Sequence, residues 1–280
     1  MKIGLKVIKL DRQIYIFLFL VLILFVIFLI FLPPAVDWSD YYRPATIALI
    51  NQQSPYSING FINPPWVLIP MIPLLIFPEN VGRAILAVAM MSSLFFVSKK
   101  MGAGLIGSIA LLLSPPAIQL IMDGNVDWMV TLGFILPPQI GLFFIAIKPQ
   151  MGIMVIPFWM LLSWKKGGYK ELLRVFGPFT IVVLLMLIIF GLSPIMNQQD
   201  IAWGGNASLW PISIPVGMVL FIHSIRNKDI NFSIAASPCL SPFVLLHSWI
   251  GVFLVLSRQK WETLVAVVGL WIVVIIHWFY

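Results

Sequence analysis

The feature that most constrains this chain is an uncharged apolar run near its N-terminus. Residues 14–34 contain no Asp, Glu, Lys or Arg, and the basic residues Lys2, Lys6, Lys9 and Arg12 precede them. About 20 apolar residues in a helix cross ~30 Å of hydrocarbon. A signal peptide has a shorter apolar core and a small-residue cleavage site, which do not fit this run. We therefore expect residues 13–34 to be a retained first span, with a cytoplasmic N-terminus.

The rest of the chain continues this pattern, because 61% of its residues are hydrophobic and 10% are charged. A soluble domain is about 45–50% apolar and ~25% charged, so we exclude a soluble enzyme, a disordered tail and a nucleic-acid binder. The positive-inside rule explains the formal net charge of +7. We expect an all-α polytopic membrane protein in a prokaryotic plasma membrane. Residues 1–280 would form a single transmembrane domain of about 8–10 spanning or half-spanning helices.

The longest stretch that is not plainly spanning covers residues 37–82, which are rich in the aromatic rings that suit the headgroup region. Pro44 is well placed to open a short helix. Four prolines interrupt the apolar segment 63–77, namely Pro64, Pro65, Pro70 and Pro73. We expect an outer loop with interfacial or re-entrant helices, followed by the remaining helical bundle in residues 83–280.

Prolines also break two later apolar runs. Pro137–Pro138 lies in the middle of residues 128–147, where it removes two backbone donors. Lipid tolerates such a break only inside protein or beside a wet cavity. We favour two half-helices that return to the outer side and end at Lys148, and a kinked full span is the alternative. The Ser-Pro pair at 237–242 predicts a tight hairpin within residues 230–257.

Two carboxylates, Asp37 and Asp40, directly follow the first span. A carboxylate here could act as a general base on a hydroxyl group, and its pKa would rise on partial desolvation. The alternative is that both are loop carboxylates that hold the segment in water and pair with Arg43. The segment from Asn63 to Trp66 is either a rigid turn or a wall of a substrate groove.

Further polar residues interrupt the apolar sequence. Asp123 and Asp127 are either loop solubilisers or oxygen ligands of a divalent cation. Lys148 is costly at membrane depth and is a functional candidate, with snorkelling as the alternative. His247 has a structural and a functional interpretation. A single cysteine, Cys239, and scattered histidines predict no disulfide and no zinc site. We expect no cofactor, and a divalent cation at the outer interface stays open.

The order of these motifs resembles that of the polytopic GT-C glycosyltransferases, most closely glycosyltransferase family 87, the polyprenol-phosphate-mannose-dependent mannosyltransferases. The motifs are Asp37-Trp38, Tyr41-Tyr42, Ser54-Pro55-Tyr56, Asn63-Pro64-Pro65-Trp66, Gly124-Asn125-Val126-Asp127 and Lys148-Pro149-Gln150. The similarity covers about residues 37–260. Members are commonly longer, and many have Gln where this chain has Asn125. The resemblance implies a GT-C-like bundle with interfacial helices in its first outer loop.

The resemblance also implies an activity. A sugar, such as mannose or another hexose, would move with inversion from a polyprenyl-phosphate donor to an acceptor hydroxyl on the outer face. Asp37 matches the acid of the family's opening motif, and Asp40 could share or replace its role as base. Lys148 and Arg43 are the candidates to hold the donor phosphate. The other implied substrate-binding residues are Tyr41, Asn63, Trp66, Asn125, Asp127, Gln150 and His247. The implied partners are membrane lipids, the donor and a glycolipid, glycan or protein acceptor, and no nucleic acid is expected.

Two other classes of function remain open. A small transporter or flippase for a lipid-linked substrate would use the proline breaks to line a cavity. A non-catalytic membrane protein would keep only a GT-C-like shape. A transporter would favour ionisable groups at mid-membrane, whereas most of the candidate residues of this chain are expected at the outer boundary, which favours chemistry at the interface.

Overall fold

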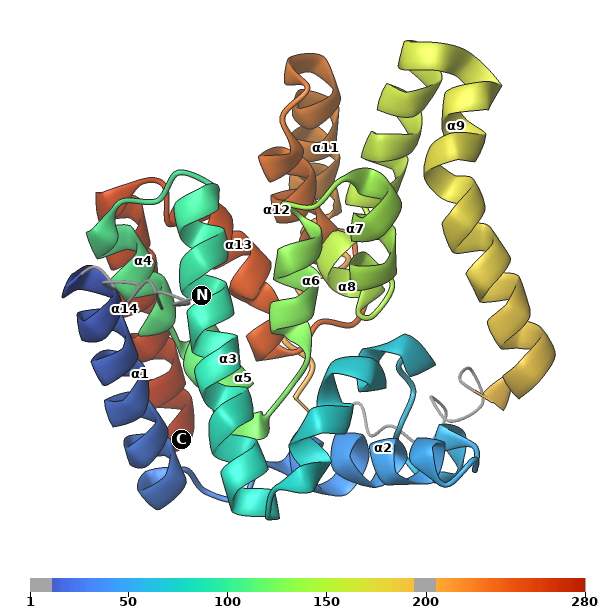
Figure 1. Cartoon of the computed structure of the whole chain (residues 1–280). Helices are drawn as coiled ribbons and strands as arrows, with labels where there is room; N and C mark the ends of the chain where they lie inside the picture. The colour runs from blue at the N-terminus through green and yellow to red at the C-terminus, as the bar shows by residue number, and fades with distance from the viewer. Residues whose placement is uncertain (1–11, 194–204, 280) are drawn as a thin grey trace, which may run out of the picture.

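The computed structural model describes residues 12–193 and 205–279, and this part of the chain is mostly helical and contains no strand. One group of helices packs together at the left of Figure 1. Its members are α1 (Arg12–Phe31), α3 (Glu79–Lys100), α4 (Leu105–Leu112), α5 (Pro115–Asp123), α13 (Ile250–Leu256) and α14 (Lys260–Phe279). The all-α architecture expected from composition is therefore confirmed for the described residues.

A second group of helices lies at the upper right of Figure 1. It consists of α6 (Asp127–Gly133), α7 (Pro138–Ile145), α8 (Pro149–Gly152), α9 (Val155–Phe190), α11 (Ile214–Asn227) and α12 (Ile230–Cys239). α9 consists of two helical segments separated by a kink, because Gly167 and Gly168 leave the helical conformation, with a φ of +58° at Gly168. Glycine adopts this positive φ without the steric cost that a Cβ would add.

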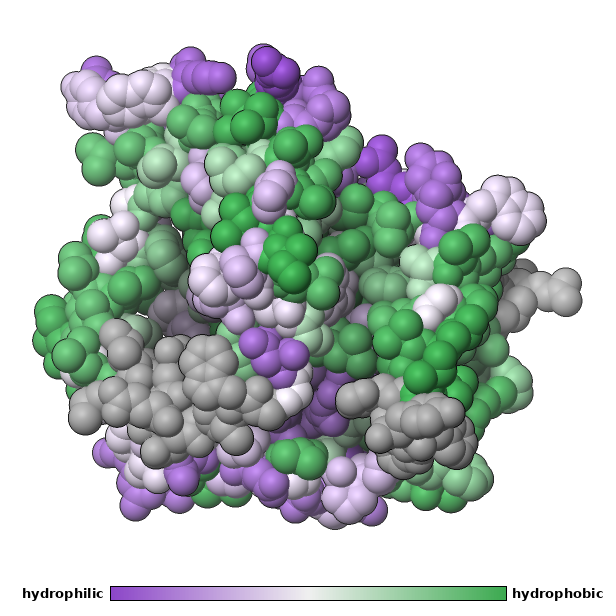
Figure 2. Space-filling view, turned by 180° about the vertical axis from the view of Figure 1, so that it is seen from behind, coloured by the Kyte–Doolittle hydropathy of each residue, from purple (hydrophilic) through white to green (hydrophobic). Residues whose placement is uncertain are grey.

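Two described helices, α3 and α9, are long and apolar enough to cross a membrane. The bent pair α4 and α5, which meet at 53°, makes a third if it counts as one broken span. Figure 2 shows a broad band of hydrophobic side chains between two hydrophilic ends of the molecule. These features support membrane association. The larger number of spans, the sidedness and the GT-C-like bundle remain predictions.

The first loop, residues 37–78, is largely helical. A π-helix, η1 (Asp37–Tyr42), runs directly into α2 (Arg43–Ile50), where Pro44 occupies the first turn as expected. A short 3₁₀ turn, η2 (Pro55–Ser57), follows. The 3₁₀-helix η3 (Pro65–Ile76) contains Pro70 and Pro73, whose rings and missing N–H groups disfavour a regular α-helix. The segment that the sequence marked as an interfacial or re-entrant piece is thus a tight helix.

The proline break at Pro137–Pro138 separates α6 from α7. The two short helices pack closely, since a Cβ on Gly141 would lie 2.6 Å from the carbonyl oxygen of Gly133. The two far ends of the pair also meet, because Asp127 at the start of α6 contacts Lys148, which follows α7. The two helices therefore double back on each other as a hairpin, and their position relative to a membrane stays a prediction.

Candidate functional site

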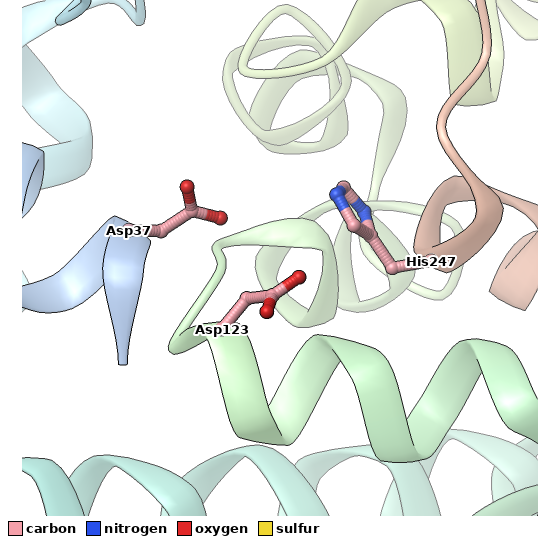
Figure 3. Close-up of side chains that lie close together, drawn as sticks. All are labelled: Asp37, Asp123 and His247. Atoms are coloured by element: carbon pink, nitrogen blue, oxygen red, sulfur yellow. The ribbon is translucent and has the colours of Figure 1, made fainter. Parts of the chain in front are cut away.

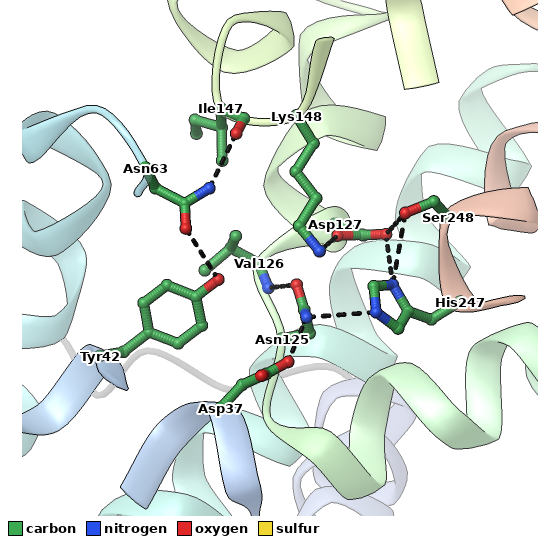
Figure 4. Close-up of polar contacts among 10 residues, drawn as sticks. All are labelled: Asp37, Tyr42, Asn63, Asn125, Val126, Asp127, Ile147, Lys148, His247 and Ser248. Atoms are coloured by element: carbon green, nitrogen blue, oxygen red, sulfur yellow. Dashed lines mark hydrogen bonds and ion pairs between the residues drawn. The ribbon is translucent and has the colours of Figure 1, made fainter. Parts of the chain in front are cut away.

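Four separate segments bring polar side chains together between the two helix groups. Asp37 comes from η1, the turn 123–127 joins α5 to α6, and Lys148 lies between α7 and α8. The fourth segment is the 3₁₀ turn η5 (Leu246–Trp249), which contributes His247 and Ser248. We call Asp37, Asn125, Asp127, Lys148, His247 and Ser248 the polar cluster (Figure 4).

Gly124 allows the 123–127 turn to approach the first loop. It ends α5 in the left-handed conformation, with a φ of +68°. A Cβ at this position would lie only 2.7 Å from the Cβ of Trp38, so the close approach also requires glycine. The turn is therefore held against η1 at the residue that follows Asp37.

Asp127 is the centre of the polar cluster, and its side chain is completely buried. The ammonium nitrogen of Lys148 lies 2.6 Å from Oδ1, and His247 Nδ1 lies 2.8 Å from Oδ2. Ser248 Oγ donates a hydrogen bond to Oδ2 at 2.8 Å. A buried carboxylate is tolerated when it is paired and hydrogen-bonded in this way. Asp127 is thus an internal anchor and not a loop solubiliser.

Asn125 links this anchor to Asp37. Its side-chain oxygen accepts a hydrogen bond from the backbone N–H of Val126 at 2.6 Å, which fixes the amide. The amide nitrogen then donates to the carboxylate of Asp37 and lies 3.4 Å from His247 Nε2. Nδ1 of His247 faces the carboxylate of Asp127, so Nε2 is the ring nitrogen that faces the Asn125 amide.

Asp37 is half-buried at the edge of the polar cluster, whereas Asp40 on the same π-helix is exposed. Burial raises the pKa of the Asp37 carboxyl group above its ordinary value, and the charges of Lys148 and His247 offset part of that rise. A carboxylate with a raised pKa takes a proton more readily. Of the two candidate bases, Asp37 has the environment that suits the role.

Asn63 connects the first loop to the segment that carries Lys148. Its amide donates to the carbonyl of Ile147 at 2.8 Å, and its oxygen accepts from the hydroxyl of Tyr42 at 3.2 Å. Nearby, the indole N–H of Trp66 donates to the carbonyl of Phe143 at 2.9 Å. Both residues, predicted as substrate-binding, serve to tie the loop to the end of α7 in this structure.

The remaining candidates lie outside the polar cluster. Tyr41 packs over Gly60, with its Cε1 2.5 Å from where a Cβ on this glycine would lie. Gln150 lies half-buried in the first turn of α8. Arg43 donates to the carbonyl of Phe77 at 3.3 Å, and its guanidinium lies over the ring of Trp38. The position of Arg43 does not support the donor-phosphate role expected for it.

Sequence analysis did not select Ser248 and assigned no catalytic or substrate-binding role to Asp123. The only sequence signal for Ser248 is a hydroxyl next to His247. Because Asp127 is far from Ser248 in the sequence, the hydrogen bond between them could not be predicted. Asp123, Asp37 and His247 bring potential metal ligands within 4.8 Å of one another (Figure 3). Their carboxylate oxygens and imidazole nitrogen are ligand atoms of the kind that bind a divalent cation. In this structure the amide nitrogen of Asn125 lies between these two side chains, donating to Asp37 and lying 3.4 Å from Nε2 of His247.

Comparisons with known proteins add no assignment. No family model, no curated protein and no solved structure matches the chain. The geometry of the polar cluster is therefore the basis on which a function is proposed.

Proposed function

We propose that this protein is a membrane glycosyltransferase that moves a sugar from a polyprenyl-phosphate donor to an acceptor hydroxyl, with Asp37 as the general base. The observation that supports this proposal is the half-buried Asp37 carboxylate, which has a raised pKa beside a fixed amide, an imidazole and an ammonium group. A proton-accepting carboxylate next to hydrogen-bond donors and a cation is typical of sites that catalyse proton and group transfer.

The proposed reaction begins at Asp37, which removes the proton of the acceptor hydroxyl while the acceptor oxygen attacks C1 of the sugar. The bond between C1 and the phosphate oxygen breaks with inversion, and the electron pair leaves on the polyprenyl phosphate. The transferred proton remains on Asp37 until solvent takes it, so charge and atoms balance.

Lys148 is the proposed partner of the departing phosphate. An ammonium group has three N–H donors, and Asp127 neutralises it from one side at 2.6 Å. The pairing fixes the position of the ammonium group, so it costs little reorganisation when negative charge develops on the phosphate. In this scheme Asp127 is a positioning residue that acts through Lys148 and His247.

The test is transfer by the purified full-length protein in liposomes. The donor would be a short-chain polyprenyl-phosphate mannose or glucose, and the readout would be a new glycosidic product in mass spectrometry. The proposal predicts product with at least one donor and acceptor, and none with the folded Asp37→Asn variant. Movement of an intact donor between leaflets without any product would contradict it and favour a flippase.

A further inference from the structure

A cavity of about 390 Å³ lies between η1, α2, η2 and the start of α3, and none of the residues of the polar cluster lines it. We call it the loop cavity. Its polar lining residues are Ser39, Arg43, Gln53, Ser57 and Glu79. Its volume falls in the usual range of ligand sites, about 300–1,000 Å³. The proposed reaction uses none of these residues.

The two charges of the loop cavity do not pair with each other. Among the salt bridges of the described residues, none joins Arg43 to Glu79. Glu79 Oε1 accepts the hydroxyl of Ser39 at 2.5 Å, and Arg43 Nη2 donates to the carbonyl of Phe77. Arg43 Nη1 is covered and has no hydrogen-bond partner.

These groups define the chemistry of the ligand. The charges of Arg43 and Glu79 cancel, so the lining does not favour an anion, and a phosphate would meet the Glu79 carboxylate. A hydroxyl group donates to a carboxylate and accepts from a guanidinium, and the amide of Gln53 can do both. Pro44 and Ile58 add an apolar surface that suits the C–H face of a sugar ring.

We propose that the loop cavity binds a neutral carbohydrate unit. Its role as a subsite for the acceptor rests on the proposed glycosyltransferase function, whereas carbohydrate binding itself does not. Arg43, expected from the sequence to hold the donor phosphate, would then contact the acceptor instead.

Saturation-transfer NMR on the full-length protein in lipid nanodiscs tests the binding. The preparation should contain neither glycerol nor glycoside detergent, since both are polyols. The probes are three neutral trisaccharides, built from mannose, glucose and galactose. We expect saturation transfer to at least one trisaccharide, with no displacement by inorganic phosphate. No transfer to any of the three, or displacement by phosphate, would overturn the proposal.

Two variants and a control locate the binding. Ser57→Trp fills the mouth of the loop cavity from an exposed position and should weaken binding at least tenfold. Glu79→Gln removes one charge with little change in shape and should weaken binding several-fold. Asn59→Trp, exposed and outside the lining, should leave binding unchanged. Equal binding by all three variants would overturn the proposal.

The same preparations separate this proposal from the proposed reaction. Carbohydrate binding without any sugar transfer would retain the loop cavity as a carbohydrate site and reject the acceptor role. Sugar transfer that Ser57→Trp leaves unchanged, with no trisaccharide bound by the wild type, would reject the cavity and retain the enzyme.

Discussion

Replacing Lys148 with methionine should destabilise the protein strongly, because it leaves the carboxylate of Asp127 without its closest cation. Lys148 is 7% exposed and Asp127 is 0% exposed. Their charged atoms are 2.6 Å apart, and because both side chains are buried, little solvent screens the attraction. Removing one partner of a buried pair costs about 3–5 kcal/mol. A larger domain loses about 2–4 °C of Tm per kcal/mol, so Lys148→Met should lower the Tm by about 6–20 °C.

Thermal unfolding in nanodiscs, followed by tryptophan fluorescence, measures this shift. Lys166→Met is a matched control, because Lys166 lies 2.8 Å from Glu171 but its side chain is 71% exposed. Its effect should be much smaller. The double variant Asp127→Asn/Lys148→Met contains no unpaired carboxylate at this position and should recover most of the lost stability. A Lys148→Met shift no larger than that of Lys166→Met, or a double variant no better than the single one, would refute the reasoning.

Three further predictions concern the polar cluster. The transfer rate should fall as the pH drops through the pKa of Asp37, because the protonated carboxyl group no longer acts as a base. Burial raises this pKa, so the rate should fall at a higher pH than for an ordinary aspartate. A rate that stays constant from pH 4 to 7 would contradict this prediction. Gly124→Ala should lower stability by about 1–3 kcal/mol and reduce transfer, measured by Tm and rate, because φ is +68° and Trp38 leaves no room for a Cβ. Treatment with EDTA should leave the transfer rate unchanged, since the amide nitrogen of Asn125 lies between Asp37 and His247. A loss of rate that Mn²⁺ restores would instead assign a cation to these residues.

Sequence reasoning predicted local features better than long-range pairing. The first helix, the helix opened by Pro44 and the break at Pro137–Pro138 follow from apolar length and from the chemistry of proline. The candidate Lys148 follows from the cost of charge at membrane depth, and Asp37 follows from its place directly after the first span. Their functional roles stay predictions. The arguments for these helices and for the proline break need only neighbouring residues, which is why the structure confirms them.

The partners within the polar cluster could not be predicted in the same way. Asp127 and His247 are separated by 120 residues, and only the packing of η5 against α5 brings them together. The helical conformation of residues 37–42, directly before the helix that Pro44 opens, was also not predicted, because aromatic and acidic residues suggested an exposed loop. Ser39 and Arg43, from this helical stretch, both line the loop cavity. Proximity to Asp37 in the sequence therefore did not predict that Arg43 lines this cavity.

The most direct test of the central claim compares Asp37→Asn with Asp40→Asn in the sugar-transfer assay. The two carboxylates lie on the same π-helix, and Asp37, which accepts from Asn125, belongs to the polar cluster, whereas Asp40 does not. A general base contributes about 10²–10⁴-fold to a rate. The account predicts a loss of at least about 100-fold in Asp37→Asn and less than about threefold in Asp40→Asn. Full transfer by Asp37→Asn, or a large loss confined to Asp40→Asn, would contradict it.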